Sequence, residues 1–214
     1  MSPVRVLLAT RNAQKLVELR RILVAADISG VQVVGLDGVP SVPEMPETAA
    51  TFEGNALAKA RDAAAATGLV TVADDSGLEV DALNGMPGVL SARWAGRHGD
   101  DSANLQLVLD QLVDVPEDRR GAAFVCAAAL VVPPGVAISG TETVVRGRWR
   151  GALTRAARGS NGFGYDPIFM PDGDRRTSAE LEPAEKDAVS HRGRALRALL
   201  PALRDLLSSC SARS

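Results

Sequence analysis

Short apolar runs alternate along the chain with stretches whose apolar residues recur at helical spacing. The first part predicts a strand from Val4 to Ala9, a helix with its apolar face between Leu16 and Leu23, and a second strand from Gln32 to Leu36. A longer helix is predicted from Thr51 to Thr67, because Thr51 suits a helix N-cap and Gly68 suits a left-handed helix end. This order of strands and helices is typical of α/β proteins.

The second part adds a hairpin and two more helices. Two apolar runs, 122–132 and 136–148, are separated by a Pro-Pro-Gly sequence and predict an antiparallel hairpin, so the sheet is expected to be mixed. Helices are predicted from Asn104 to Val113 and from Arg192 to Leu207, and a frayed tail from Ser208 to Ser214. We therefore expect an α/β fold with a long mixed central sheet flanked by helices.

The composition is that of an ordinary globular protein. With 214 residues, 46% of them hydrophobic and 23% charged, the chain can bury a full core over residues 1–207, as one domain or as two lobes of a single fold. A formal net charge of -2 provides no global field that steers a polyanion, which argues against binding of an extended nucleic-acid duplex. Neither Cys126 nor Cys210 has the spacing of a metal site or a disulfide framework, and no signal peptide or membrane span is predicted. We expect a cytoplasmic protein.

Two adjacent carboxylates, Asp74 and Asp75, follow the apolar run from Leu69 to Ala73. This run predicts a buried strand that ends at Asp74 and gives way to a turn at Ser76 and Gly77. Neighbouring anions need a cation or a proton between them, and such a pair suits Mg2+, which leaves coordination sites for water and phosphate oxygens. The alternative is a solvated turn whose carboxylates bind nothing.

A second candidate site is the turn after the first strand, Thr10-Arg11-Asn12-Ala13-Gln14-Lys15. It places a hydroxyl, a guanidinium, an amide and an ammonium at a helix N-terminus, where free backbone N–H groups and the helix dipole favour an anion such as phosphate. It lacks the glycines of a Walker loop or a dinucleotide-binding fingerprint, so neither label applies. The alternative is that Asn12 only caps the helix and that Lys15 is solvated.

Two further clusters lie towards the end of the chain. The sequence Gly159-Ser160-Asn161-Gly162-Phe163-Gly164-Tyr165-Asp166-Pro167 combines glycines, which let the backbone approach a ligand, with aromatic rings that can stack on a base. The alternative is that Phe163 and Tyr165 pack inward. Lys186 and the sequence Ser190-His191-Arg192 precede a helix and could bind phosphate or a keto oxygen, or simply lie on the surface.

Taken in order, these motifs closely resemble the Ham1/RdgB-type non-canonical purine nucleoside triphosphate pyrophosphatases, also called inosine/xanthosine triphosphatases. The resemblance extends from about Val4 to Leu203. It is carried by Leu8-Ala9-Thr10-Arg11-Asn12 with Lys15, Glu47-Thr48, Thr51-Phe52, Asn55-Ala56-Leu57-Ala58-Lys59-Ala60, Ala73-Asp74-Asp75-Ser76-Gly77-Leu78, Pro87-Gly88, Ser91-Ala92-Arg93, Phe163-Gly164-Tyr165-Asp166-Pro167-Ile168-Phe169, Glu185-Lys186 and Ser190-His191-Arg192-Gly193. Each motif alone is weak, but their order along the chain is very specific.

The departures from the family pattern are local. Ala49 stands where many members have Gly, Gly54 where many have an acidic residue, and Asn161 where Gly is common. Carboxylates remain nearby at Glu47 and Glu53, and the two adjacent aspartates are unchanged.

The resemblance implies a Maf/Ham1-like fold with two lobes, a nucleotide cleft between them, and a homodimer. It also implies Mg2+-dependent hydrolysis of ITP, dITP and XTP to the monophosphate and pyrophosphate, which removes deaminated purines from the nucleotide pool. Asp75 would be the proton acceptor and a metal ligand, with Asp74 and Glu47 supporting the metal. The substrate would contact Thr10, Arg11, Asn12, Ala13, Gln14, Lys15, Lys59, Ser76, Phe163, Gly164, Tyr165, Asp166, Lys186, His191 and Arg192. The residues from Thr10 to Lys15 would hold the triphosphate, and the last groups would chiefly hold the base.

The residue types agree with these roles. Water that attacks the α-phosphorus needs a base, a metal offsets charge on the phosphate oxygens, and Lys15 and Lys59 could neutralise the departing pyrophosphate. Donors such as Lys186 or Arg192 that face purine O6 would disfavour adenine, whose amino group is also a donor. Two alternatives stay open: a metal-dependent phosphohydrolase acting on other nucleotides, and a nucleotide sensor that binds without turnover.

Overall fold

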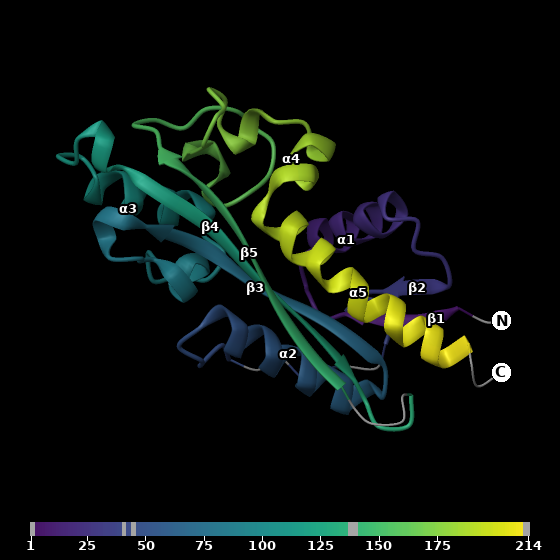
Figure 1. Cartoon of the computed structure of the whole chain (residues 1–214). Helices are drawn as coiled ribbons and strands as arrows, with labels where there is room; N and C mark the ends of the chain where they lie inside the picture. Colours follow the sequence, from purple (N-terminus) through teal and green to yellow (C-terminus); the bar gives the residue numbers. More distant parts are fainter. Residues whose placement is uncertain (1–2, 40–41, 44–45, 137–140, 212–214) are drawn as a thin grey trace. The chain divides into compact units, whose positions relative to one another are not determined.

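The computed structural model describes residues 3–39, 42–43, 46–136 and 141–211 of the chain. Within these ranges the strands form one mixed sheet in the order β2-β1-β3-β4-β5-β6 (Figure 1), which confirms the predicted α/β class. The strands are β1 (Val4–Leu8), β2 (Val31–Val34), β3 (Val70–Val80), β4 (Gly121–Val132), β5 (Thr141–Leu153) and β6 (Phe169–Pro171). The helices are α1 (Ala13–Ala25), α2 (Phe52–Thr67), α3 (Asp101–Gln111), α4 (Pro183–Val189) and α5 (His191–Ser211).

The sheet contains both parallel and antiparallel pairs. β1 runs parallel to its two neighbours, with Val6 opposite Val33 of β2 and opposite Val70 of β3. Parallel neighbours require a crossover connection, and α1 and α2 provide these connections. β5 and β6 are antiparallel, with Ala152 opposite Met170. The predicted mixed sheet is therefore confirmed.

The boundaries of α2 match the prediction. Thr51 caps α2 by accepting the Gly54 N–H at 3.1 Å, and Gly68 ends this helix with a φ of 67°. Both residues had been assigned these roles from the sequence. α3 begins earlier than predicted, at Asp101, because the side chain of Asp100 supplies its N-cap.

α5 is longer than predicted and continues to Ser211 (yellow in Figure 1). Residues 208–211 of the expected frayed tail are therefore helical, and residues 212–214 lie outside the described residues. The Ser208 hydroxyl donates to the Arg204 carbonyl at 2.9 Å, four residues back. Such a bond satisfies a serine inside a helix, so the serines at this end do not terminate it.

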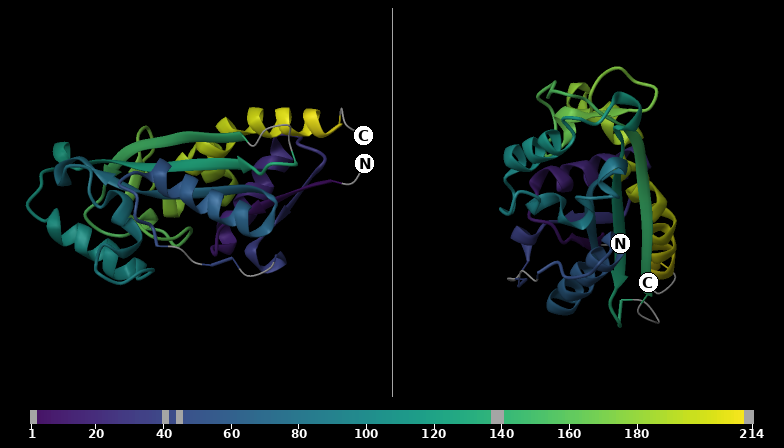
Figure 2. Two further views of the ribbon diagram at one scale, coloured as in Figure 1. Left: turned by 90° about the horizontal axis from the view of Figure 1, so that it is seen from below. Right: turned by 90° about the vertical axis from the view of Figure 1, so that its left-hand side faces the viewer.

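The chain divides into two compact units. The first comprises Met1–Asp75, Ala127–Gly147 and Gly193–Ser214, and the second comprises Ser76–Cys126 and Arg148–Arg192. β3, β4 and β5 each contain residues of both units, and Figure 2 shows β4 and β5 side by side. β1 and β2 belong to the first unit alone and β6 to the second.

The cores of the two units differ in character. In the first unit, α2 buries small side chains, including Ala56 and Ala60. In the second unit the core is aromatic, with the ring centroid of Phe169 lying 4.6 Å from that of Phe124 and 5.3 Å from that of Trp149. Tilted pairs of this kind are favourable contacts between aromatic rings. Among the described residues, no helix combines the length and the apolar character needed to cross a membrane.

Arg120 is a buried cation that ties α3 to β5 in the second unit. Its side chain is among the largest that are fully buried, and the residue is 1% exposed. The guanidinium donates to the carbonyls of Leu112, Leu153 and Thr154 at 2.7, 2.8 and 2.9 Å. A guanidinium carries donors in several fixed directions, so one side chain satisfies carbonyls at the ends of two elements.

We expect Arg120→Met to lower the free energy of unfolding by at least about 3 kcal/mol, because three buried carbonyls lose their donor. Arg120→Lys should recover only part of this loss, since one ammonium cannot reach all three acceptors. Denaturant unfolding followed by tryptophan fluorescence measures both variants, with the exposed neighbour in Arg119→Met as the matched control. A loss below about 1 kcal/mol for Arg120→Met would contradict this role.

Candidate active site

The adjacent carboxylates Asp74 and Asp75 lie inside β3 and not at its end. The predicted strand end at Asp74 is wrong, because β3 continues through the small residues that follow, as far as Val80. Gly77 lies within this strand and does not form a turn. A Cβ at this position would lie 2.9 Å from the Ser91 Cβ, so glycine permits close packing of the strand against Ser91. Consecutive strand residues point to opposite faces, and the two carboxylates therefore have different partners.

Asp75 is buried against side chains of α2. Asn55 Nδ2 donates to its Oδ2 at 3.1 Å, and Lys59 Nζ contacts its Oδ1 at 3.1 Å. Burial raises the pKa of the Asp75 carboxyl above its ordinary value; the charge of Lys59 and the bond from Asn55 oppose this shift, whereas the charge of Glu47 adds to it. A hydrogen-bonded carboxyl with a raised pKa is suited to accept a proton.

Asn55 connects this carboxylate to the loop before α2. It is 2% exposed, and its Oδ1 accepts the Ala49 N–H at 2.9 Å while its Nδ2 bonds Asp75. A buried amide with both ends engaged fixes the groups that it bonds. This role of Asn55 is not evident from the sequence. The available signal was its position one helical turn before Lys59, which places both side chains on one face of α2.

Lys59 lies in the field of three carboxylates. Its Nζ contacts Glu47 Oε1 at 2.8 Å and Asp75 Oδ1 at 3.1 Å. Burial lowers the pKa of Lys59, but the charges of Asp75, Asp74 and Glu47 together outweigh burial and raise it above its ordinary value. Among the described residues, no group of three or more His, Cys, Asp or Glu side chains forms a ready metal site. In this structure the shared cation of Glu47 and Asp75 is the Lys59 ammonium.

The turn before α1 provides the partner of Asp74. Lys15 Nζ contacts Asp74 Oδ2 at 2.8 Å. Asn12 is the N-cap of α1, where its Oδ1 accepts the Gln14 N–H at 2.8 Å, and its own N–H donates to Thr10 Oγ1 at 3.1 Å. The capping alternative for Asn12 is thus confirmed, whereas Lys15 is not merely solvated.

A pocket in the second unit gathers predicted contacts from three separate parts of the sequence. Its empty space of about 520 Å³ includes the open solvent at its mouth. The predicted contacts that line it are Ser76, Phe163, Gly164, Tyr165, Asp166, Lys186, His191 and Arg192. The loop of residues 159–167 and the helices around Lys186 therefore contribute to one site.

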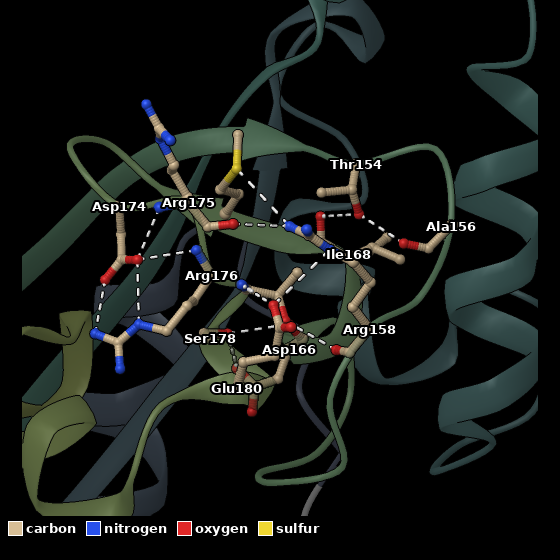
Figure 3. Close-up of polar contacts among 12 residues, drawn as sticks. Thr154, Ala156, Arg158, Asp166, Ile168, Asp174, Arg175, Arg176, Ser178 and Glu180 are labelled. Carbon is tan, nitrogen blue, oxygen red and sulfur yellow. Dashed lines mark hydrogen bonds and ion pairs between the residues drawn. The ribbon is translucent and has the colours of Figure 1, made fainter.

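Asp166 organises the polar side of this pocket. It is 2% exposed and forms an ion pair with Lys186. Its Oδ2 also accepts the Phe163 N–H at 2.8 Å. Its Oδ1 accepts the Ser178 hydroxyl at 2.7 Å (Figure 3). Because Lys186 is itself buried, the alternative that it lies on the surface is wrong. The carboxylate holds the ammonium at the pocket wall.

The two aromatic residues of the loop have different positions. Tyr165 packs inward, as the alternative had it, and its hydroxyl donates to the Ser91 carbonyl at 2.8 Å. Burial raises the pKa of the Tyr165 hydroxyl well above its usual range. Phe163 is half-buried in the pocket lining, with Lys186 Nζ 5.6 Å and Arg192 Cζ 5.5 Å from its ring centroid. An aromatic ring beside two cations suits a flat ligand that carries keto oxygens.

The first turn of α5 completes the pocket. The ring of His191 stacks on Phe124, with centroids 4.7 Å apart and an interplanar angle of 13°. Arg192 donates to the Ser76 hydroxyl at 3.0 Å. Both side chains are buried, which again excludes a purely surface position. Ser76 directly follows Asp75 in β3, so one strand contributes to both groups of candidate residues.

Comparison with known proteins decides the family. The model of the Ham1 family matches residues 6–202, nearly the whole chain. The chain belongs to the Ham1 family. This finding confirms the resemblance derived from the sequence motifs.

Relatives within the Ham1 family are similar over almost their full length. A dITP/XTP pyrophosphatase of Nocardia farcinica is 68% identical over 203 residues, which cover 95% of this chain and 96% of the relative. A dITP/XTP pyrophosphatase of Mycobacterium tuberculosis is 64% identical over 202 residues, which cover 94% of this chain and 96% of the relative. The solved nucleoside-triphosphatase / dITP/XTP pyrophosphatase of Mycobacterium abscessus is 62% identical, with a TM-score of 0.74 and 94% and 100% covered. A HAM1 protein of Coxiella burnetii is 41% identical, with a TM-score of 0.82 and 94% and 99% covered.

Some residues of the Ham1 site were not found by sequence reasoning. These are Asn55, Ser91, Asp101 and Ser178, each of which contacts a predicted site residue. The sequence indicates Ser91 only through its place in a motif of the family, and it gives no indication of a role for Ser178. Three of the predicted substrate contacts are exposed at the start of α1, namely Arg11, Ala13 and Gln14.

Two departures from the Ham1 pattern at the start of α2 compensate each other. A Cβ on Gly54 would lie 2.7 Å from the Ala49 Cβ and 3.2 Å from Thr51 Oγ1. The methyl group of Ala49 therefore occupies the space that a side chain at position 54 needs. A chain with Gly at position 49 has this space available.

We expect Gly54→Asp to lower the free energy of unfolding by about 1–3 kcal/mol, because it overpacks this contact. Combining it with Ala49→Gly should recover most of the loss, which gives a coupling energy of similar size in a double-mutant cycle. Denaturant unfolding of the wild type, both single variants and the double variant measures this coupling. Simply additive effects would show that the two positions do not compete for space.

We expect Asp75→Asn to raise the unfolding temperature at neutral pH in buffer with a chelator. In the folded state, burial raises the pKa of Asp75 above its unfolded value of about 3.9. The protonated side chain therefore contributes its full stability only below this unfolded pKa, and the contribution is lost as the pH rises through the folded-state pKa. The advantage of the amide should therefore vanish near about pH 3 and grow towards neutrality. Thermal unfolding across this range tests it against the exposed control Asp110→Asn. An advantage that does not vary with pH would refute the explanation.

Proposed function

We propose that the protein is a Mg2+-dependent pyrophosphatase of non-canonical purine nucleoside triphosphates, namely ITP, dITP and XTP. The products are the nucleoside monophosphate and pyrophosphate. The observation that carries the proposal is the buried Asp75 carboxylate, held by Lys59 and Asn55. Further support comes from relatives between 56% and 68% identical that are named dITP/XTP pyrophosphatases.

In the proposed reaction, Asp75 accepts a proton from the water that attacks the α-phosphorus. A bond forms between the water oxygen and the α-phosphorus. The bond from the α-phosphorus to the bridging oxygen breaks, and pyrophosphate leaves with the electron pair. Asn55 and Lys59 each bond one carboxylate oxygen, which keeps the proton acceptor from rotating and orients it towards the water.

The phosphate chain is proposed to contact Lys15, Lys59 and the turn from Thr10 to Lys15. Both lysines are held by carboxylates, with Lys15 2.8 Å from Asp74 and Lys59 2.8 Å from Glu47. Phosphate oxygens accept the same charge-assisted hydrogen bonds, so these ammonium groups could exchange partners when the substrate binds. The positive charge would then neutralise the departing pyrophosphate.

Three carboxylates are proposed to hold Mg2+, although among the described residues they do not form a ready metal site as they stand. Glu47, Asp74 and Asp75 supply carboxylate oxygens, the ligand type that Mg2+ prefers together with water and phosphate. Their combined charge already raises the pKa of Lys59 and so favours a cation among them. When bound, the ion would offset charge on the phosphate oxygens and on the leaving group.

The pocket of the second unit is proposed to select the purine base. Phe163 offers an aromatic face, and Lys186 and Arg192 offer donors beside it. A 6-keto purine satisfies such donors through O6. Adenine presents an amino group there, and each unmatched buried donor costs about 1–3 kcal/mol.

The proposal extends to assembly and location, as the family resemblance implies. We propose a homodimer in the cytoplasm that removes deaminated purines from the nucleotide pool. Its substrate is a free nucleotide and not a nucleic-acid polymer, in line with the small negative net charge of the chain.

We expect rapid release of pyrophosphate from ITP and XTP in the presence of Mg2+, exceeding release from GTP, ATP and dTTP by about tenfold or more. Asp75→Asn should lose activity by about a hundredfold or more, because the proton acceptor becomes an amide. A coupled pyrophosphate assay over the five substrates measures both, with Asp110→Asn as the control. Mg2+ should also raise the unfolding temperature of the wild type more than that of Asp75→Asn.

The possible outcomes separate the remaining alternatives. Equal activity on all five substrates would refute the base selectivity. Activity confined to dTTP would point to a phosphohydrolase of other nucleotides. Stabilisation by ITP without release of pyrophosphate would identify a nucleotide sensor.

A further inference from the structure

Phe163 lies between two glycines whose backbone conformations few other residues adopt. The φ angles of Gly162 and Gly164 are 78° and 61°. Glycine imposes little restraint on the peptide groups beside it, so these neighbours alone would let the backbone at Phe163 rotate. The direction in which the Phe163 ring leaves the backbone must therefore be fixed by other contacts.

Two carboxylates hold the peptide groups on either side of Phe163. The Phe163 N–H donates to Asp166 Oδ2 at 2.8 Å, and the Gly164 N–H donates to Asp101 Oδ2 at 2.8 Å. Hydrogen bonds to ionised carboxylates are stronger than those between neutral groups. Holding both peptide planes fixes φ and ψ of Phe163, and with them the direction of its Cα–Cβ bond.

Asp101 is exposed, and its backbone is held by α3. It is the first residue of α3, directly after the N-cap Asp100, whose carboxylate accepts the Ala103 N–H at 3.1 Å. At the other end of this helix, Arg120 binds the Leu112 carbonyl. Asp101 therefore presents its carboxylate from a helix that is held at both ends.

We infer that Asp101 is a positioning residue for recognition of the purine base. Its carboxylate holds the peptide group between Phe163 and Gly164, so that the Phe163 ring forms a wall of the base pocket. This inference deepens the proposed function and rests on it. Because Asp101 acts on the base pocket and not on the α-phosphorus, its loss weakens substrate binding and leaves the chemical step unchanged.

Steady-state kinetics of Asp101→Ala with ITP and Mg2+ test this inference. We expect KM to rise about tenfold while kcat stays within about twofold of the wild type. Asp101→Asn should restore most of the binding, because its amide oxygen still accepts the Gly164 N–H. Asp110→Ala serves as the control, because Asp110 lies on the same helix and its carboxylate accepts a bond from Gln106; this variant should behave as the wild type.

A double-mutant cycle with Phe163→Ala separates positioning from direct contact, because Asp101 also lines the pocket. If Asp101 acts through the ring, Asp101→Ala should change KM by less than about twofold once the ring is absent. Full additivity would show that Asp101 touches the base itself, and this would overturn the inference.

Amide exchange provides a readout that does not depend on catalysis. In Asp101→Ala the Gly164 N–H should exchange at least about tenfold faster by NMR, while the Phe163 N–H, held by Asp166, stays unchanged. Two outcomes would overturn the inference and leave the proposed function standing, provided that the wild type releases pyrophosphate. One is an unchanged exchange rate of the Gly164 N–H in Asp101→Ala, and the other is an unchanged KM of this variant. A wild type that releases no pyrophosphate from ITP overturns the proposed function and the substrate role of Asp101 with it.

Discussion

Burying ionised carboxylates is the constraint on which both groups of candidate site residues depend. A carboxylate removed from water needs a cation and hydrogen-bond donors to replace its hydration, or it destabilises the fold by several kcal/mol. The buried carboxylates Asp75 and Asp166 meet this need in the same way, each with one lysine and neutral donors. Their partners are Lys59 and Asn55 for the first, and Lys186, Ser178 and the Phe163 backbone for the second.

The two carboxylates differ in the chemistry that their partners leave available to them. At Asp75, burial still raises the pKa, so the group keeps an affinity for a proton that a solvated aspartate lacks. Asp166 instead bonds three neighbours at once and serves to hold the loop and the ammonium beside the pocket. One pattern of partners thus leaves a carboxylate suited to accept a proton in the first unit and a carboxylate that holds a loop in the second.

Local signals in the sequence predicted the parts of the fold that local interactions determine. The cap at Thr51 and the glycine at the end of α2 were found because each acts on its own helix. The end of β3 was mispredicted because small polar residues are typical of turns, whereas pairing and the packing of Ser91 on Gly77 keep the strand continuous. The roles of Asn55 and Asp101 depend on Asp75 and Gly164, which are 20 and 63 residues away. The short pattern of Asn55 and Lys59 places both on one helix face, but it does not show what they bind.

The crowding between positions 49 and 54 also has an evolutionary consequence. Relatives that have Gly at the first position and an acidic residue at the second differ from this chain by two changes. An intermediate with side chains at both positions would press on the loop whose backbone Asn55 binds, close to the proposed proton acceptor. A path that replaces the acidic residue by Gly before the methyl group of Ala49 is added avoids this crowding at every step.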